Sequence, residues 1–96
     1  MQTLSRTLVE EVTFDRARVT STDWSTYAIL TFPDVPQLDI EPIDHRHERP
    51  LGAGEATAAA GATAVGNAGF DTTGARLRTA PFTAARVKAA LTTQAT

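Results

Sequence analysis

The chain has 96 residues, with 9 lysines and arginines, 11 aspartates and glutamates, and no cysteine. With a net charge of −2, the chain lacks the excess of basic residues that binding to a nucleic-acid backbone requires. Because it has no cysteine, the chain itself forms no disulfide, ligates no iron–sulfur cluster and performs no thiolate chemistry. Of the 40 hydrophobic residues 17 are alanines, so only 23 side chains can bury a large apolar area. We therefore expect a chain of marginal stability that depends on a partner to fold.

The N-terminal segment does not have the pattern of a signal peptide. Residues 1–12 contain Arg6, Glu10 and Glu11 and no apolar run of about 7 to 15 residues. No window of the chain approaches the roughly 20 apolar residues that a membrane helix needs. We therefore expect a cytoplasmic chain without a membrane span, with periplasmic export alongside a partner as the alternative.

The chain opens with an amphipathic pattern and continues with strand-forming segments. Residues 1–12 predict a short helix, because apolar side chains recur every four positions. Residues 12–20 predict a short hairpin, and residues 27–32 are rich in strand formers. Residues 38–41 alternate apolar and acidic side chains, and Pro42 places this strand near a sheet edge.

The second half is richer in alanine, glycine and threonine. Residues 55–70 predict an alanine-rich helix, and Gly74 is a natural C-terminal stop. A short strand is expected at residues 76–78, after which Thr83 caps a final helix at residues 84–91. The coarse class is therefore α+β, with short antiparallel strands and two or three helices.

A charged loop is expected at residues 44–54. Its sequence Asp44-His-Arg-His-Glu48 invites a metal interpretation, because two imidazoles spaced two apart share one face of an extended chain. A structural zinc site usually needs four ligands, and the sequence has no second cluster. A solvated loop is the simpler interpretation, and we expect no metal held by side chains.

Gly52-Ala53-Gly54 precedes a helix, as a phosphate-cradling loop would. The dinucleotide fingerprint requires a preceding strand and a third glycine, whereas here Arg49-Pro50 precede and Thr57 holds the third position. A dinucleotide-binding fold is therefore rejected. The two glycines still allow the backbone to approach another group closely.

Glu55 follows these glycines and opens the helix, and two interpretations stay open for it. An exposed Glu55 is a favourable first-turn residue, because the helix dipole stabilises its charge by about 0.3–1 kcal/mol. Burial beneath a partner would raise the pKa of this carboxyl and prepare it to accept a proton near neutrality.

Several longer stretches, with consistent spacing over residues 2–91, resemble one family. The chain is similar to the C-terminal end of the molybdopterin-binding large subunit of the xanthine dehydrogenase and aldehyde oxidase family, in particular the isoquinoline 1-oxidoreductase beta-subunit type. The stretches that carry this resemblance are Leu4–Arg16, Val19–Leu30, Pro50–Glu55, Phe70–Arg78 and Pro81–Leu91.

The resemblance implies a site. The family's Gly-x-Gly-Glu glutamate, which is the active-site base, corresponds to Glu55, and Gly52, Ala53 and Gly54 fall in its cofactor-binding loop. A glutamine near the pterin corresponds to Gln2. No metal ligand is implied, because the family holds molybdenum through the pterin.

The resemblance also implies a function and partners. The family hydroxylates a carbon of an aldehyde or N-heterocycle with oxygen from water. Its members use a molybdopterin cofactor, here expected in the cytosine dinucleotide form and only in the full assembly. The expected partners are the remainder of the molybdenum subunit, or an upstream split subunit, and an iron–sulfur electron-transfer subunit. Residues 1–96 would then be the C-terminal part of a molybdopterin-binding domain whose upstream part is missing.

Some positions depart from the family pattern, and rival hypotheses stay open. Ala28 and Ala56 stand where the family favours proline, and Gly66 and Gly69 replace larger helix residues. The fragment could be a split subunit, a truncated product or an excised piece, inactive alone. The main rival is a non-enzymatic remnant or small interaction module, and a distant third is a small enzyme built on the residue 44–48 cluster.

Overall fold

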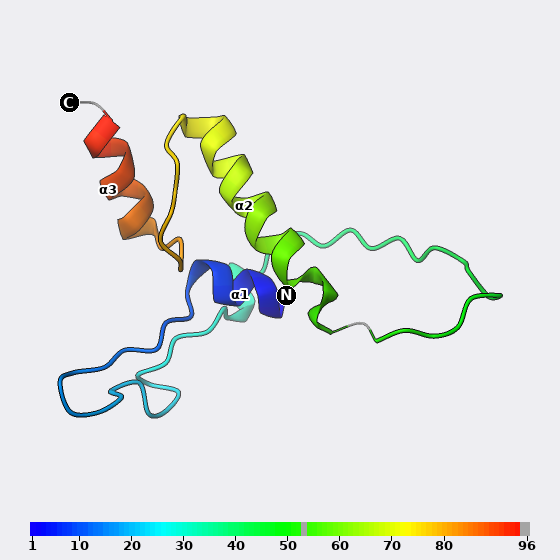
Figure 1. Cartoon of the computed structure of the whole chain (residues 1–96), viewed down its shortest axis with the longest axis horizontal. Coiled ribbons are helices and arrows are strands. Elements are labelled where there is room, and N and C mark those ends of the chain that lie inside the picture. Colours follow the sequence, from blue (N-terminus) through cyan, green and yellow to red (C-terminus); the bar gives the residue numbers. More distant parts are fainter. Residues whose placement is uncertain (53, 95–96) are drawn as a thin grey trace.

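The computed structural model describes residues 1–52 and 54–94 of the chain. The described residues form three α-helices, and irregular segments connect them (Figure 1). The elements in chain order are α1 (Gln2–Leu8), the 3₁₀ turn η1 (Phe32–Asp34), the 3₁₀ turn η2 (Glu55–Thr57), α2 (Ala58–Thr73) and α3 (Ala84–Gln94). Residues 35–52, called the arm below, leave the helices and return to them at η2.

Helix α1 is shorter than the predicted helix over residues 1–12. It ends at Leu8, and the N–H of Glu10 donates to the carbonyl of Ser5 at 3.1 Å. Glu10 and Glu11 would place negative charge at the C-terminal end of a longer helix, where the dipole disfavours it. The buried residues of α1 are polar, namely Ser5, which accepts the N–H of Leu30, and Thr7, whose hydroxyl donates to the carbonyl of Thr3.

Helix α2 confirms the predicted alanine-rich helix and its stop. Gly74 adopts the left-handed conformation with φ of 71°, and its N–H donates to the carbonyl of Phe70 at 2.7 Å. Helix α1 packs against α2 at Gly61, where an added Cβ would lie 2.7 Å from Cγ2 of Thr3. Glycine is therefore required at Gly61 by close approach of the two helices.

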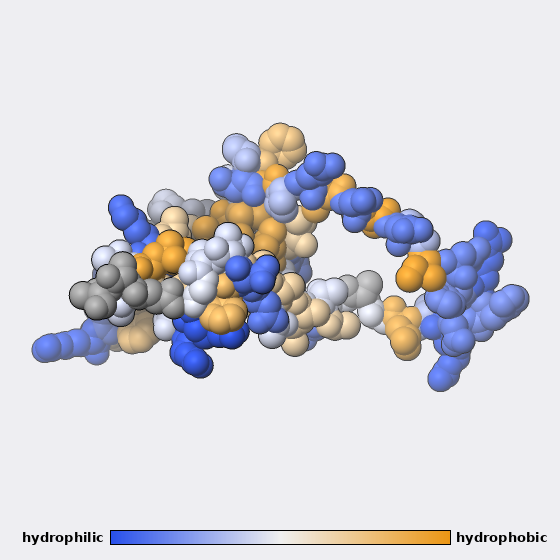
Figure 2. All heavy atoms as spheres, turned by 90° about the horizontal axis from the view of Figure 1, so that it is seen from above, coloured by the Kyte–Doolittle hydropathy of each residue, from blue (hydrophilic) through white to orange (hydrophobic). Residues whose placement is uncertain are grey.

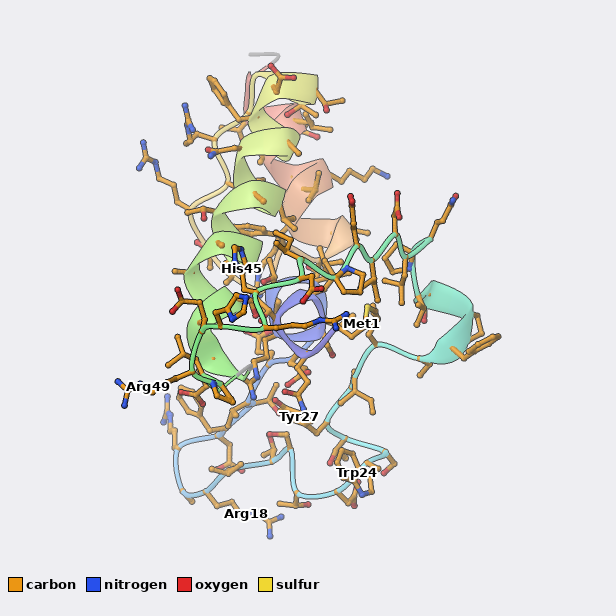
Figure 3. All side chains as sticks on the ribbon, turned by 90° about the vertical axis from the view of Figure 1, so that its right-hand side faces the viewer. Met1, Arg18, Trp24, Tyr27, His45 and Arg49 are labelled. Atoms are coloured by element: carbon orange, nitrogen blue, oxygen red, sulfur yellow. The ribbon has the colours of Figure 1, made fainter. Side chains whose placement is uncertain are left out.

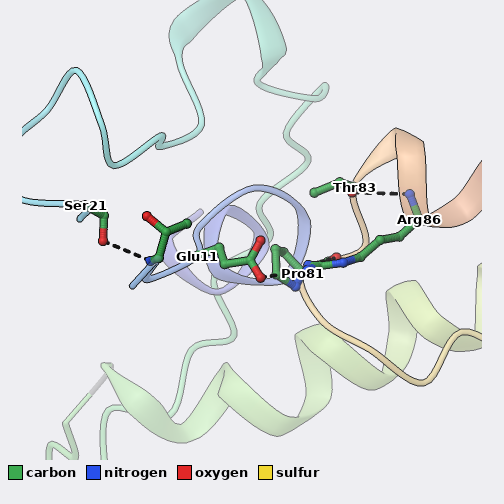
Figure 4. A network of polar contacts seen from close by, with 6 residues as sticks. Glu11, Ser21, Pro81, Thr83 and Arg86 are labelled. Atoms are coloured by element: carbon green, nitrogen blue, oxygen red, sulfur yellow. Dashed lines mark hydrogen bonds and ion pairs between the residues drawn. The ribbon is translucent and has the colours of Figure 1, made fainter. Parts of the chain in front are cut away.

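Helix α3 confirms the predicted cap at Thr83, whose hydroxyl accepts the N–H of Arg86 at 3.3 Å. The segment before α3 is attached to α1, because the N–H of Phe82 donates to the carbonyl of Thr7 at 2.6 Å. Arg86 connects α3 to the segment after α1 and to the segment before α3 (Figure 4). Its Nη2 lies 2.6 Å from a Glu11 carboxylate oxygen, and its Nη1 donates to the carbonyl of Pro81 at 3.1 Å.

The predicted strands are absent from the part of the chain that the structure describes, apart from one bridge between Phe14 and Val19. Within residues 27–32, the N–H of Leu30 instead donates to Oγ of Ser5 on α1 at 2.9 Å, and Phe32 begins η1. Residues 76–78 pack back on α2, with the Arg76 guanidinium 3.6 Å from the centroid of the Phe70 ring. Residues 38–41 pair with no strand of the described ranges. Strands need a ladder to form, so the α+β class stays a prediction.

The chain has almost no hydrophobic core. Ala75 and Pro81 are the buried apolar residues of the described ranges. The accessible surface is 8431 Å², against about 5,300 Å² expected for a compact protein of this mass. The radius of gyration is 16.8 Å, against about 12.5 Å for a compact chain of this length. Figure 2 shows hydrophobic residues lying between hydrophilic ones along the exposed arm. No helix within the described ranges has the length and apolar character to cross a membrane.

Candidate functional site

The packing of α1 on α2 creates a hollow of about 490 Å³ at the start of both helices. It is lined by the first turns of α1 and by the chain entering α2, so it brings together residues far apart in the sequence. The side chains and backbone that define its two walls are Gln2, Thr3 and Arg6 on α1, and Gly54, Glu55 and Thr57 at η2. Three of the predicted site residues, Gln2, Gly54 and Glu55, therefore face one space, although 52 residues separate Gln2 from Glu55.

Two contacts hold the walls of this hollow together. The hydroxyls of Thr3 and Thr57 are 3.5 Å apart, which joins α1 directly to η2. One turn further along α2, Gly61 allows the methyl group of Thr3 to approach the helix backbone. Small residues at the crossing thus set the position of the η2 turn relative to α1.

Glu55 is the first residue of η2, directly after Gly54 at the N-cap. Its side chain is exposed, and its carboxylate makes no hydrogen bond or ion pair with any residue in ranges 1–52 and 54–94. Arg6 adds a positive charge to the opposite wall of the hollow. The chain alone does not bury Glu55, so the role of a proton-accepting base requires a partner that covers the hollow.

The glycines of the predicted cofactor loop lie in open space. A Cβ added at Gly52 or Gly54 would meet no atom within 4 Å, and Gly54 has an ordinary φ of −81°. Within the described ranges, neither crowding nor backbone conformation requires glycine at these two positions. The predicted loop residue Ala53 lies outside the residues that the structure describes.

A second hollow of about 400 Å³ lies on the other side of α1 and shares Gln2 and Arg6 with the first. Figure 3 shows Tyr27 beside α1 and Trp24 on the neighbouring turn. The Tyr27 hydroxyl donates to a Glu10 carboxylate oxygen at 2.8 Å. Hydrogen bonds from Ser5 and then Tyr27, with the charge of Arg6, lower the pKa of Glu10, and the same carboxylate raises the pKa of Tyr27.

The sequence analysis did not assign Thr3, Arg6 and Thr57 to the site. Arg6 could have been found, because it lies four positions after Gln2 and so shares its face on the predicted helix. Thr3 and Thr57 gave no signal, since their proximity depends on the crossing of α1 and α2.

The charged cluster at residues 44–48 lies on the arm, which extends away from α1 and α2 (Figure 1), and none of its residues lines the hollow. Arg46 pairs with Asp44 at 2.8 Å, and both side chains are mostly exposed. Within the described ranges, no three histidine, aspartate or glutamate side chains come together as a metal site would require.

No family model and no solved structure matches this chain. Over 91 residues the chain is 46% identical to one of the subunits of nicotinate dehydrogenase from Pseudomonas putida. The chain is similar to part of a dehydrogenase subunit. The matched region makes up 95% of this chain and 8% of that relative, so the chain spans less than a tenth of the length of the protein it matches.

This similarity supports the coarser part of the resemblance seen in the sequence, a fragment related to the molybdenum hydroxylases. It does not support the finer assignment to the isoquinoline 1-oxidoreductase type, because the relative carries the name of a different dehydrogenase. The roles of Glu55, Gln2 and the glycine loop stay predictions.

Proposed function

We propose that the chain is a segment of the cofactor-binding subunit of a molybdenum hydroxylase and that Glu55 is its active-site base. The observation that carries this proposal is the convergence of Gln2 and Glu55 on one hollow, in a chain that is 46% identical to part of a dehydrogenase subunit. The whole enzyme would hydroxylate a carbon of an aldehyde or an N-heterocycle, such as nicotinate, with oxygen from water.

The residues around the hollow fit a molybdopterin cofactor. Gln2, Thr3 and Thr57 supply amide and hydroxyl groups that can hydrogen-bond to a pterin, and Arg6 supplies a positive charge suited to phosphate. Gly52 and Gly54 present backbone without crowding, so a large group can approach closely. When bound, the molybdenum cofactor, which we propose in its cytosine dinucleotide form, supplies the two-electron oxidation of the substrate carbon.

Glu55 would then accept a proton at one of its carboxylate oxygens. It lies directly after Gly54, on the turn that leads into α2. Cover by the cofactor and the rest of the protein would exclude water from the hollow, and a carboxylate positioned there is suited to act as a general base.

The exposed surface supports the proposed partners. The accessible surface exceeds that of a compact protein of the same mass by about 3,100 Å², which is several times the roughly 800 Å² that one partner contributes to a standard interface. We propose that the remainder of the molybdenum subunit covers most of this surface. We also propose an iron–sulfur subunit that receives the electrons, as the family resemblance implies.

Replacement of Glu55 by glutamine in the whole enzyme tests this function. Glutamine keeps the length of the side chain but cannot accept the proton, and we expect kcat to fall by about 10²–10⁴-fold with unchanged cofactor content. The matched control is Glu48→Gln on the arm, which should change turnover no more than a few-fold. Both variants should fold like the parent, since Glu55→Gln removes only a dipole interaction of about 0.3–1 kcal/mol.

The alternative function, a non-enzymatic remnant or interaction module, predicts a different outcome. In that case the protein would contain no cofactor and show no turnover, and Glu55→Gln would not change its binding to a partner protein. Equal activity of the Glu55 and Glu48 variants would reduce Glu55 to a first-turn carboxylate. Loss of cofactor in the Glu55 variant would assign it a structural role.

A further inference from the structure

The arm contains a segment with the pattern of a strand but without a partner. Residues 37–41 lie between Pro36 and Pro42, and apolar Leu38 and Ile40 alternate with acidic residues. The segment has no helical or strand assignment, and its backbone forms no hydrogen bond with any residue in the described ranges. Its backbone groups are therefore available to a partner.

The apolar side of this segment is also uncovered. Leu38 is 54% exposed and Ile40 is 77% exposed. A period-two alternation places these two side chains on one face of a strand and Asp39 and Glu41 on the other. A half-buried strand shows this pattern, whereas a solvated loop has no need of two large aliphatic residues on one face.

We propose that residues 37–41 form an edge strand of a β-sheet whose other strands lie in the protein outside residues 1–96. The relative supplies the argument for such a partner, because 92% of its length lies outside the matched region. The excess accessible surface of the chain is a second argument. It is far larger than the area that one strand can cover, as expected for a chain that packs against a larger protein. The inference rests on the proposed function in one respect, that the chain is part of a larger protein.

The two prolines determine which side of the strand pairs. Successive backbone N–H groups of a strand point to opposite edges, so Pro36, Leu38, Ile40 and Pro42 share one edge. Proline has no N–H and is tolerated where this edge faces solvent. The N–H groups of Gln37, Asp39 and Glu41 must then donate to the neighbouring strand.

The side chains define the chemistry of that neighbouring strand. On the face of Leu38 and Ile40 it should carry β-branched or aromatic residues, which complete an apolar layer. On the face of Asp39 and Glu41 it should carry lysine, arginine or threonine, because acidic residues directly opposite one another would repel.

Hydrogen exchange in the whole protein tests the inference. We expect the amides of Gln37, Asp39 and Glu41 to exchange about a hundredfold more slowly than in an unstructured chain, and those of Leu38 and Ile40 to exchange within a few-fold of that rate. Exchange of all five amides at the unstructured rate would overturn the proposal. Protection of all five would overturn the edge position, because a central strand pairs on both sides.

A pair of variants at one residue separates backbone pairing from charge. Asp39→Pro removes a proposed donor and should abolish the protection of Gln37 and Glu41, whereas Asp39→Asn keeps the N–H and should retain it. Retained protection in the proline variant would contradict the pairing. These readouts do not depend on turnover, so an inactive role for Glu55 would leave the strand inference standing, and a failed strand inference would leave the Glu55 test unchanged.

Discussion

Glu10 shows how a single residue connects the irregular first third of the chain to α1. Its carboxylate accepts a hydrogen bond from Tyr27, which lies 17 positions later, and the N–H of Leu30 reaches Oγ of Ser5 one turn earlier on α1. These contacts lie beside the hollow that shares Gln2 and Arg6 with the candidate site. The segment around Tyr27 therefore supports the helix that carries one wall of the site.

The Tyr27–Glu10 hydrogen bond predicts a pH dependence. The pKa of Glu10 lies below its ordinary value of 4.5, so this carboxylate stabilises the fold above that pH, and its contribution is lost as the pH falls through the lowered pKa. We expect Tyr27→Phe to raise the pKa of Glu10 toward 4.5 and to weaken this acid dependence. A carboxyl-detected NMR titration of both proteins at about 15 °C, where small domains are most stable, measures it.

Asp15 is an internal control for that titration. Backbone N–H groups of Ala17 and Arg18 lower the pKa of its carboxyl, and Tyr27 has no part in this. Tyr27→Phe should leave the Asp15 titration unchanged. A shift of both carboxyls would indicate loss of the fold, and a shift of neither would contradict the hydrogen bond.

Among the elements, the helices were predictable from the sequence and the strands were not. Gly74 and Thr83 mark helix ends through local backbone chemistry, and both function as expected. A strand forms only where a second strand can pair with it. Residues 27–32 and 76–78 contact helices instead. Residues 38–41 have no pairing strand within the described ranges. Periodicity therefore identified segments suited to strands but could not supply the ladder.

The candidate site was predictable only in part. Glu55 and Gln2 were proposed from resemblance to a family, and their convergence on one hollow follows from the crossing of α1 and α2, which no local pattern encodes. The sequence did indicate small residues in α2, and at Gly61 this helix leaves space for the side chain of Thr3 on α1.

That crossing predicts opposite effects for two similar substitutions. Gly61→Ala places a methyl group 2.7 Å from Cγ2 of Thr3, and overpacking of about 1–3 kcal/mol should exceed the gain of about 1 kcal/mol in helix propensity. Gly66→Ala meets Phe82 at 3.5 Å, an ordinary contact, and should stabilise α2 by up to about 1 kcal/mol. Hydrogen exchange of the α2 amides, measured in the whole protein, compares them.

The Thr3→Ser background completes this test. Serine keeps the hydroxyl near Thr57 but removes Cγ2, so Gly61→Ala should become stabilising there, with a coupling free energy of about 1–3 kcal/mol. An equal effect of Gly61→Ala in both backgrounds would show that the helices do not meet at this glycine.

The whole molecule is an open arrangement that leaves many of its large apolar side chains exposed to solvent. Phe32 and Leu51 are each 91% exposed, and Trp24 is 80% exposed on a turn that Asp23 locks by accepting hydrogen bonds from Ser25 and Thr26. Ordered turns that present large apolar side chains are suited to contact with another protein surface.

We predict that residues 1–96 in isolation are at best marginally folded. One buried alanine and a radius of gyration of 16.8 Å leave little hydrophobic stabilisation against the entropy of ordering the chain. Calorimetry should show no cooperative transition above about 65 °C, the upper range of ordinary mesophilic domains. X-ray scattering should give a radius of gyration well above the roughly 12.5 Å of a compact chain. A high, cooperative transition with a compact radius would contradict the dependence on a partner.

The arm has a consequence for how this chain can change in length. Fifty-two residues separate Gln2 from Glu55, and closing a loop of that size opposes the assembly of the hollow by on the order of 3 kcal/mol. Loop closure entropy grows only with the logarithm of length, so doubling the loop would add only about 0.6 kcal/mol. Insertions at the exposed turn between His45 and Glu48 therefore leave the two walls of the hollow in register, and this turn is the place where the chain can acquire new segments without disturbing its site.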